Sequence, residues 1–186
     1  MHRRTLIQSI QDIPPAYRDT PIGRLLEYHN LGRSHDAYTS AQLLIGMCMD
    51  NRKHMNIPDN FAFIIRAGGG NLRDSEFKVS YAIAVGGVRC IALIGHTECG
   101  MVNLIARKEP FITGLSEGAG WTRAQAEEHF NQFAPRFEIG HEVDFVLSES
   151  KRLRARYPKI MIAPFIYRVV DNRLYSRRYR GTQCPK

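Results

Sequence analysis

The chain has 186 residues and a formal net charge of +8, with 44% hydrophobic and 24% charged residues. This length and balance fit one folded domain with appendages and exclude a largely disordered chain. Four cysteines are too few for a disulfide-built scaffold, and no apolar run approaches the ~20 residues of a membrane helix. The basic amino terminus is not followed by the apolar segment of a secretory signal. We therefore expect a cytoplasmic protein with no membrane partner.

The positive charge is concentrated at the carboxyl end. Residues 151–186 hold 11 Lys and Arg and one acidic residue, a net of +10, whereas residues 1–150 hold 15 basic and 17 acidic residues, a net of −2. Residues 173–180 interleave aromatic with basic side chains, a pattern that suits single-stranded nucleic acid. No recognised nucleic-acid motif accompanies them, so we expect a solvated or subunit-contacting tail and no nucleic-acid partner.

The first 40 residues are polar and predict an N-terminal arm with one short helix. Pro21 follows Thr20, as a proline at the first helical position would, and Leu25, Leu26 and Tyr28 come next. The arm has no obvious core of its own. We therefore expect it to pack on another surface.

Apolar runs and helical segments alternate through the rest of the chain. Strands are expected at residues 42–48, 61–66, 90–94 and 159–170, with a short extension at 173–175. Helices are expected at residues 74–86, 102–107, 122–133 and 140–156, the last with Val143, Val146, Leu147 and Leu153 on one face. The alternation predicts an α/β fold, a mainly parallel β-sheet flanked by helices, with an N-terminal helical arm and a basic C-terminal tail. The expected divisions are an arm at 1–40, an α/β domain at 41–175 and the tail at 176–186.

Two of the expected strands end in residues that bind metals. The first is followed by Cys-Met-Asp-Asn-Arg at 48–52, and the third by Gly-His-Thr-Glu-Cys-Gly at 95–100. The carboxyl ends of parallel strands form the usual site of an α/β sheet, so these segments should lie together. One cysteine at a strand end is more often a core residue, but two cysteines and one histidine together suit Zn²⁺ with a fourth position open. Cys90 is expected in the core, and Cys184 to be an incidental thiol.

These segments resemble the signature of the β-class carbonic anhydrases. The resemblance rests on 48–52, on Arg-Ala-Gly-Gly-Gly-Asn at 66–71 and on 95–101, and it covers residues 41–107 and, more weakly, 160–175. It implies a zinc lyase, a carbonate dehydratase that hydrates CO₂ reversibly to bicarbonate by zinc-bound hydroxide. The zinc ligands that it implies are Cys48, His96 and Cys99. The implied catalytic dyad is Asp50 and Arg52, and the implied substrate-binding glycines are Gly69 and Gly70. It also implies a homodimer or a higher homo-oligomer, with the arm wrapped around the partner.

The chemistry of zinc supports the roles of Asp50 and Arg52. Two thiolates neutralise the metal charge and oppose the activation of water, so a hydrogen-bond acceptor that orients the water would compensate. Asp50 follows Cys48 by two residues, and Arg52 can pair with it and hold it ionised and away from the metal. If the pair breaks, Asp50 becomes a fourth ligand and closes the site, which is a pH-switch hypothesis.

The sequence departs from the family pattern in two places. The family commonly has Asn-Ala-Gly-Asn at the position of residues 66–71 here. Many members also have a Gln-x-Pro segment ahead of the first strand, which this sequence lacks; Gln42 is the one glutamine nearby. Relatives with the same zinc ligands hydrolyse CS₂ or COS, so that activity stays open. A non-catalytic, zinc-stabilised binding protein is a third alternative. A narrow apolar pocket is needed for catalysis, and four residues are candidates to shape it: Ile45, Phe61, Phe63 and Val88.

Overall fold

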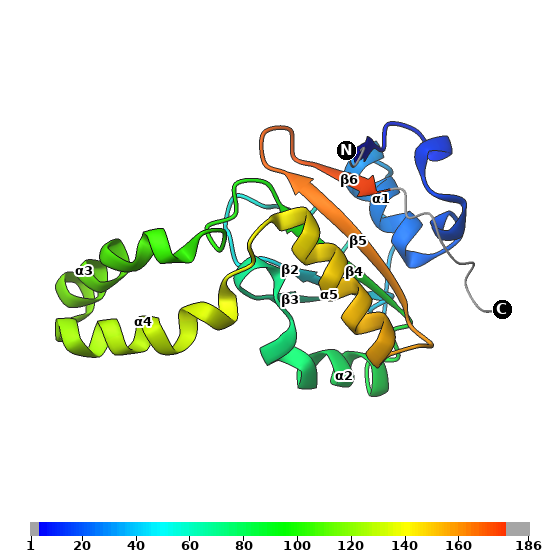
Figure 1. Ribbon diagram of the computed structural model, residues 1–186. Coiled ribbons are helices and arrows are strands. Elements are labelled where there is room, and N and C mark those ends of the chain that lie inside the picture. Colours follow the sequence, from blue (N-terminus) through cyan, green and yellow to red (C-terminus); the bar gives the residue numbers. More distant parts are fainter. Residues whose placement is uncertain (1–3, 178–186) are drawn as a thin grey trace.

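The computed structural model describes residues 4–177, which form a six-stranded sheet with helices on both of its faces (Figure 1). The strands lie in the order β1-β6-β5-β4-β2-β3. Their bounds are Arg4–Leu6 (β1), Leu43–Met47 (β2), Ala62–Arg66 (β3), Cys90–His96 (β4), Met161–Arg168 (β5) and Arg173–Arg177 (β6). Strands β3, β2, β4 and β5 are parallel, while β6 pairs antiparallel with β5 and with β1. The mainly parallel sheet flanked by helices is thus confirmed.

Strands β2 and β4 are buried on both faces, which explains their continuous apolar sequences. Alternate residues point to opposite faces, so that Ile45 and Ala92 join one core cluster and Leu44 and Ile91 the other. The first cluster lies against helix α1 (Pro21–Leu31), and the second against α2 (Glu76–Ala84) and α5 (Glu142–Arg156). The predicted inner face of α5 is confirmed, with three of its four residues buried and Leu147 half-buried.

Helix α1 begins and ends as the sequence indicates. The Thr20 hydroxyl accepts hydrogen bonds from the N–H groups of Ile22 and Gly23, and Gly32 ends the helix with a φ of +68°. The Asn30 side chain exchanges hydrogen bonds of 2.8 and 3.0 Å with the backbone of Leu174, which joins α1 to β6. The apolar side of the arm is therefore covered by the sheet of its own chain, and contact with a second chain stays a prediction.

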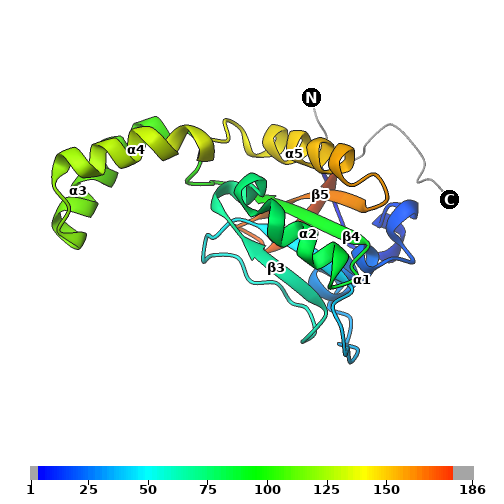
Figure 2. The same ribbon diagram turned by 90° about the horizontal axis from the view of Figure 1, so that it is seen from below.

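Helices α3 (Lys108–Ala119) and α4 (Arg123–Phe137) form a hairpin that extends away from the sheet (Figures 1 and 2). The helix expected at 122–133 is α4, and Thr122 caps it through a reciprocal pair of hydrogen bonds with Gln125. The helix expected at 102–107 is a 3₁₀ turn, Leu104–Arg107, and α3 follows it without having been predicted. The hairpin separates the second metal-binding motif from α5.

Some expectations are not tested by residues 4–177. Most of the basic tail, with Cys184, lies outside the described residues, and the divisions at 40 and 175 stay predictions. None of the helices within residues 4–177 combines the length and the apolar character needed to cross a bilayer.

Candidate metal centre

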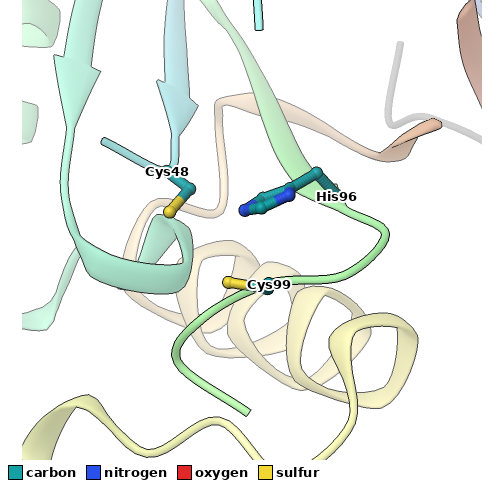
Figure 3. A group of neighbouring side chains, drawn as sticks. All are labelled: Cys48, His96 and Cys99. Carbon is teal, nitrogen blue, oxygen red and sulfur yellow. The ribbon is translucent and has the colours of Figure 1, made fainter. Parts of the chain in front are cut away.

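The three candidate ligands lie at the carboxyl edge of the parallel sheet. Cys48 follows β2, His96 is the last residue of β4, and Cys99 lies in the loop after β4. Because β2 and β4 are neighbours, the three side chains point toward one another (Figure 3). Their ligand atoms lie within 4.8 Å of one another, and all three residues are buried. This upper limit is compatible with the roughly 3.5–3.8 Å between the donors of a tetrahedral zinc site.

The His96 ring is oriented as a metal ligand. Its Nδ1 lies 3.0 Å from the carbonyl oxygen of Thr97, which fixes Nδ1 as the protonated nitrogen and leaves a lone pair on Nε2. Nε2 is buried and has no hydrogen-bond partner among the described residues. A buried polar atom without a partner is costly, and a metal ion between the two sulfurs would satisfy it.

The two thiols are suited to bind a dication together. Cys48 Sγ accepts the backbone N–H of Gly69 at 3.2 Å. A hydrogen bond from Cys99 lowers the pKa of Cys48, while the same contact with Cys48 raises the pKa of Cys99. The pair thus shares one proton that a metal ion would displace. Two sulfurs and one imidazole nitrogen are the donors that zinc takes, so the residues fit the ion that the resemblance implies.

The glycine loop approaches this cluster closely. Gly69 and Gly70 are buried and have φ values of +65° and +76°, a conformation that side chains rarely adopt. A Cβ on Gly69 would lie 2.7 Å from Cγ2 of Ile139. The loop therefore holds the Cys48 sulfur through the N–H group of Gly69, whereas the predicted contact of Gly69 and Gly70 with substrate stays a prediction.

Asp50 and Arg52 form the ion pair that the motif suggests. Arg52 Nη2 lies 2.8 Å from Asp50 Oδ2, and Arg52 Nε lies 3.1 Å from Oδ1. The guanidinium also donates to the carbonyl oxygen of Glu98 at 3.0 Å and so joins the two ligand-bearing loops. Asp50 Oδ2 is 3.9 Å from His96 Nε2, and Arg52 holds the pKa of the Asp50 carboxyl well below its usual range. The carboxylate thus faces the metal position without entering it.

Several residues of the centre were not found from the sequence. Lys53 directly follows the first motif and is fully buried, with Nζ 3.2 Å from the carbonyl oxygen of Asp50. Glu142 accepts the N–H of Cys99 at 3.4 Å, and Glu138 accepts that of Asn103 at 2.8 Å. The position of Lys53 next to the motif was a signal that could have found it. The two glutamates lie some 35–43 residues along the chain from their partners, beyond any local pattern.

The four candidate pocket residues do not come together. Ile45 and Phe61 belong to the core on the α1 side, Val88 to the core on the other side, and Phe63 is 39% exposed. Apolar neighbours of the metal centre come instead from residues after the second motif. They form a cluster with the two candidate thiol ligands: Ile139 and Phe145, with Met101 and Val102 packed against them.

We compared the chain with known protein families, curated sequences and solved structures. No family model matches the chain. A curated relative, the carbon disulfide hydrolase of Acidianus sp. (strain A1-3), is 29% identical over 135 residues, covering 70% of this chain and 63% of that protein. The chain therefore spans less than two thirds of the length of the curated relative it matches.

Among solved structures, a β-carbonic anhydrase of Trichomonas vaginalis has a TM-score of 0.64 at 18% identity, covering 82% of this chain and 91% of its own. A carbonic anhydrase from Glaciozyma antarctica has a TM-score of 0.59 at 19% identity, covering 89% and 99%. The apo form of a carbon disulfide hydrolase has a TM-score of 0.54 at 21% identity, covering 91% and 98%.

Both kinds of enzyme share most of their length with this chain, so the fold alone does not separate the two activities. The resemblance read from the motifs is confirmed: the chain has the fold of the β-carbonic anhydrases.

Proposed function

We propose that the chain is a zinc-dependent carbonic anhydrase, a lyase that interconverts CO₂ and bicarbonate. The observation that carries this proposal is the buried Cys48, His96 and Cys99 cluster with the Asp50 carboxylate held beside it, 3.9 Å from His96 Nε2. Three protein ligands leave a fourth position for water. When bound, zinc lowers the pKa of such a water from 15.7 toward roughly 7, which supplies a nucleophile at neutral pH.

The protein residues orient and confine the reaction. An ionised carboxylate only accepts hydrogen bonds, so Asp50 accepts one from the attacking water and turns a lone pair toward the carbon of CO₂. Arg52 keeps Asp50 ionised and away from the metal position. Addition of water to CO₂ gives bicarbonate and one proton, which leaves to buffer. Gly69 stabilises the Cys48 thiolate through its N–H group.

Hydrolysis of CS₂ or COS is the second candidate. The curated relative and one of the similar solved structures carry the name carbon disulfide hydrolase. CS₂ and COS are linear like CO₂ and undergo the same addition of water at carbon, with CS₂ and water giving COS and H₂S. The same roles of Asp50 and Arg52 would serve that reaction.

One sample tests these alternatives. Zinc content is measured on the full chain, followed by stopped-flow CO₂ hydration and by release of H₂S from CS₂ and COS. We expect one zinc per chain and CO₂ hydration that Asp50→Asn lowers by at least about tenfold, because the neutral amide is a weaker acceptor. Asp59→Asn removes an exposed carboxylate outside the centre and should change nothing. Activity on CS₂ alone would favour the second candidate, and bound zinc without any turnover would favour a zinc-stabilised binding protein.

We also propose that the chain forms a homodimer or a higher homo-oligomer. Strand β3 is at the edge of the sheet, and its Phe63 side chain packs against Gly86, just after the end of α2. Phe63 shares one exposed apolar face with Phe77, Tyr81 and Val85 of the α2 segment, and Ile64 is exposed on the opposite face of the same edge strand. An open edge strand beside such a face favours pairing with a second copy. Light scattering should give at least twice the chain mass, Ile64→Lys should reduce it, and a monomer at micromolar concentration would contradict the proposal.

A cytoplasmic location is part of the proposal. None of the three cysteines within residues 4–177 forms a disulfide, and thiolate ligands persist in a reducing compartment. Fractionation of the source cells tests this location, and recovery of the protein outside the cytoplasm would contradict it.

A further inference from the structure

A lysine is fully buried beside the candidate metal centre. Lys53 has 0% of its surface exposed and is among the largest side chains that the fold buries completely. Its Nζ donates to the carbonyl oxygen of Asp50 at 3.2 Å and lies 3.9 Å from Asp50 Oδ1. An ammonium group removed from water costs several kcal/mol unless negative charge lies nearby, so its surroundings need an explanation.

The negative groups near Lys53 belong to the metal centre. Burial lowers the pKa of Lys53, while the charges of Cys48, Asp50 and Cys99 oppose that change and favour the ammonium form. The positive charge of Arg66, by contrast, lowers the pKa of Lys53. Lys53 is therefore a counter-charge to the two thiolates and the carboxylate, placed where water cannot screen it.

A count of charges shows what this lysine adds. With both thiols ionised, the centre holds four negative charges, from Cys48, Cys99, Asp50 and Glu142, and two positive charges, from Arg52 and Lys53. A divalent metal brings the sum to zero, whereas a neutral residue at position 53 would leave it at −1. Arg66 and Glu98 are exposed at the rim and offset each other.

We propose that Lys53 is a specificity-determining residue that makes the metal-loaded centre prefer anionic over neutral ligands. This inference rests on the proposed function, because it requires a metal at the centre. Bicarbonate and hydrosulfide, the anionic products of the two candidate reactions, are ligands that such a centre would retain. Lys53 acts through its charge and does not itself contact them.

The test compares an anionic and a neutral probe on the full-length protein loaded with Co²⁺, whose visible spectrum reports binding. Thiocyanate is the anion and imidazole the neutral ligand. Lys53→Met removes the charge and keeps an unbranched side chain, and Lys151→Met removes an exposed charge on α5 as the matched control. We expect Lys53→Met to weaken thiocyanate binding about tenfold and to change imidazole binding less than about twofold, because the loss is electrostatic. Lys151→Met should change neither.

Other outcomes overturn the inference. Unchanged thiocyanate affinity in Lys53→Met, or an equal loss for both probes, would show that Lys53 is merely structural. If Lys53→Met does not fold, Lys53→Gln, which can still donate to the Asp50 carbonyl, must show the same selective loss. If the unmodified chain takes up no cobalt, the proposed function and this inference fail together. If cobalt binds and the variants keep their anion affinity, the inference alone fails.

Discussion

Replacing Gly69 by alanine tests the structure of the metal centre most directly. Gly69 has a φ of +65°, and its N–H group donates to Cys48 Sγ at 3.2 Å. A Cβ at this position would lie 2.7 Å from Ile139 Cγ2, closer than real side chains approach each other. The substitution therefore strains the backbone, crowds a buried neighbour and displaces a hydrogen bond to a candidate ligand.

The size of the effect follows from these contacts. The left-handed conformation costs an alanine about 1–2 kcal/mol, and crowding in a packed interior adds about 1–3 kcal/mol. We expect Gly69→Ala to lower the free energy of unfolding by about 2–5 kcal/mol, roughly 2–4 °C in Tm for each kcal/mol in a chain of this size. Loss of the N–H group from the thiolate should weaken zinc binding about tenfold or more, since a hydrogen bond to a charged group contributes about 1.5–3 kcal/mol.

Gly87→Ala is the matched control. Gly87 has a φ of +73° and no atom within 4 Å of an added Cβ, so this variant carries the backbone strain alone, about 1–2 kcal/mol. Urea unfolding and zinc competition with a chelator are measured on both variants. If Gly69→Ala unfolds at the same urea concentration as Gly87→Ala and binds zinc as tightly as the unmodified chain, the loop does not support Cys48 as described.

Three further predictions concern the dyad, the candidate ligands and one half-buried histidine. Asp50 Oδ2 lies 3.9 Å from His96 Nε2, so Arg52→Ala should leave the carboxylate free to move into the fourth ligand position. CO₂ hydration should then fall at least about tenfold with zinc still bound, and full activity would contradict the closing role. Serine in place of either candidate thiol ligand should abolish stoichiometric zinc in elemental analysis, whereas Cys90→Ser, a change in the core, should retain it. Burial, followed by the charge of Arg173, lowers the pKa of His29 to about 4. The unfolded chain then takes up the proton first, near pH 6.5, so the free energy of unfolding should fall between about pH 6.5 and 4 by up to about 1.4 kcal/mol per pH unit. Urea unfolding across that range should show this slope for the unmodified chain and a flatter one for His29→Gln.

The sequence was informative where one local pattern decides the structure. Strands β2 and β4 were predictable because a strand covered on both faces requires a continuous apolar run, and their polar ends marked the edge where the candidate ligands meet. The starts of α1 and α4 were predictable, the first from Pro21 after Thr20, and in both helices the threonine hydroxyl satisfies free N–H groups. Each of these features needs only a few adjacent residues.

The sequence was uninformative where burial is decided by distant segments. Helix α3 contains Pro110, Gly114 and Gly118 and buries only Ile112, so it lacks the apolar stripe of a core helix. Strand β1 has three residues and depends on β6, at the other end of the chain. Lys53 reads as a surface residue, because a lysine is almost never fully buried unless negative groups surround it. Cys48 and Asp50 are close to it in sequence, but the third negative group, Cys99, comes from the loop after β4.

The metal centre depends on the joint between α4 and α5. Glu138 accepts the N–H groups of Asn103 and Leu104, and the N–H of Ile139 donates to the carbonyl oxygen of Met101 at 3.2 Å. These bonds fix the chain that leaves the second motif and connect it to the chain that returns from the hairpin. Both ends of the hairpin are therefore anchored at one place.

This anchoring explains how a hairpin can lie between two parts of one site. Glu142 holds the loop of Cys99, and Ile139 lies over Gly69, whose N–H group donates to Cys48 Sγ. The joint therefore contacts the segments that support both candidate thiol ligands. Helices α3 and α4 make most of their contacts with each other and can extend into solvent without displacing a ligand. The short motifs thus supply the donors, while a segment some 40 residues later supplies the rigidity that a metal site needs.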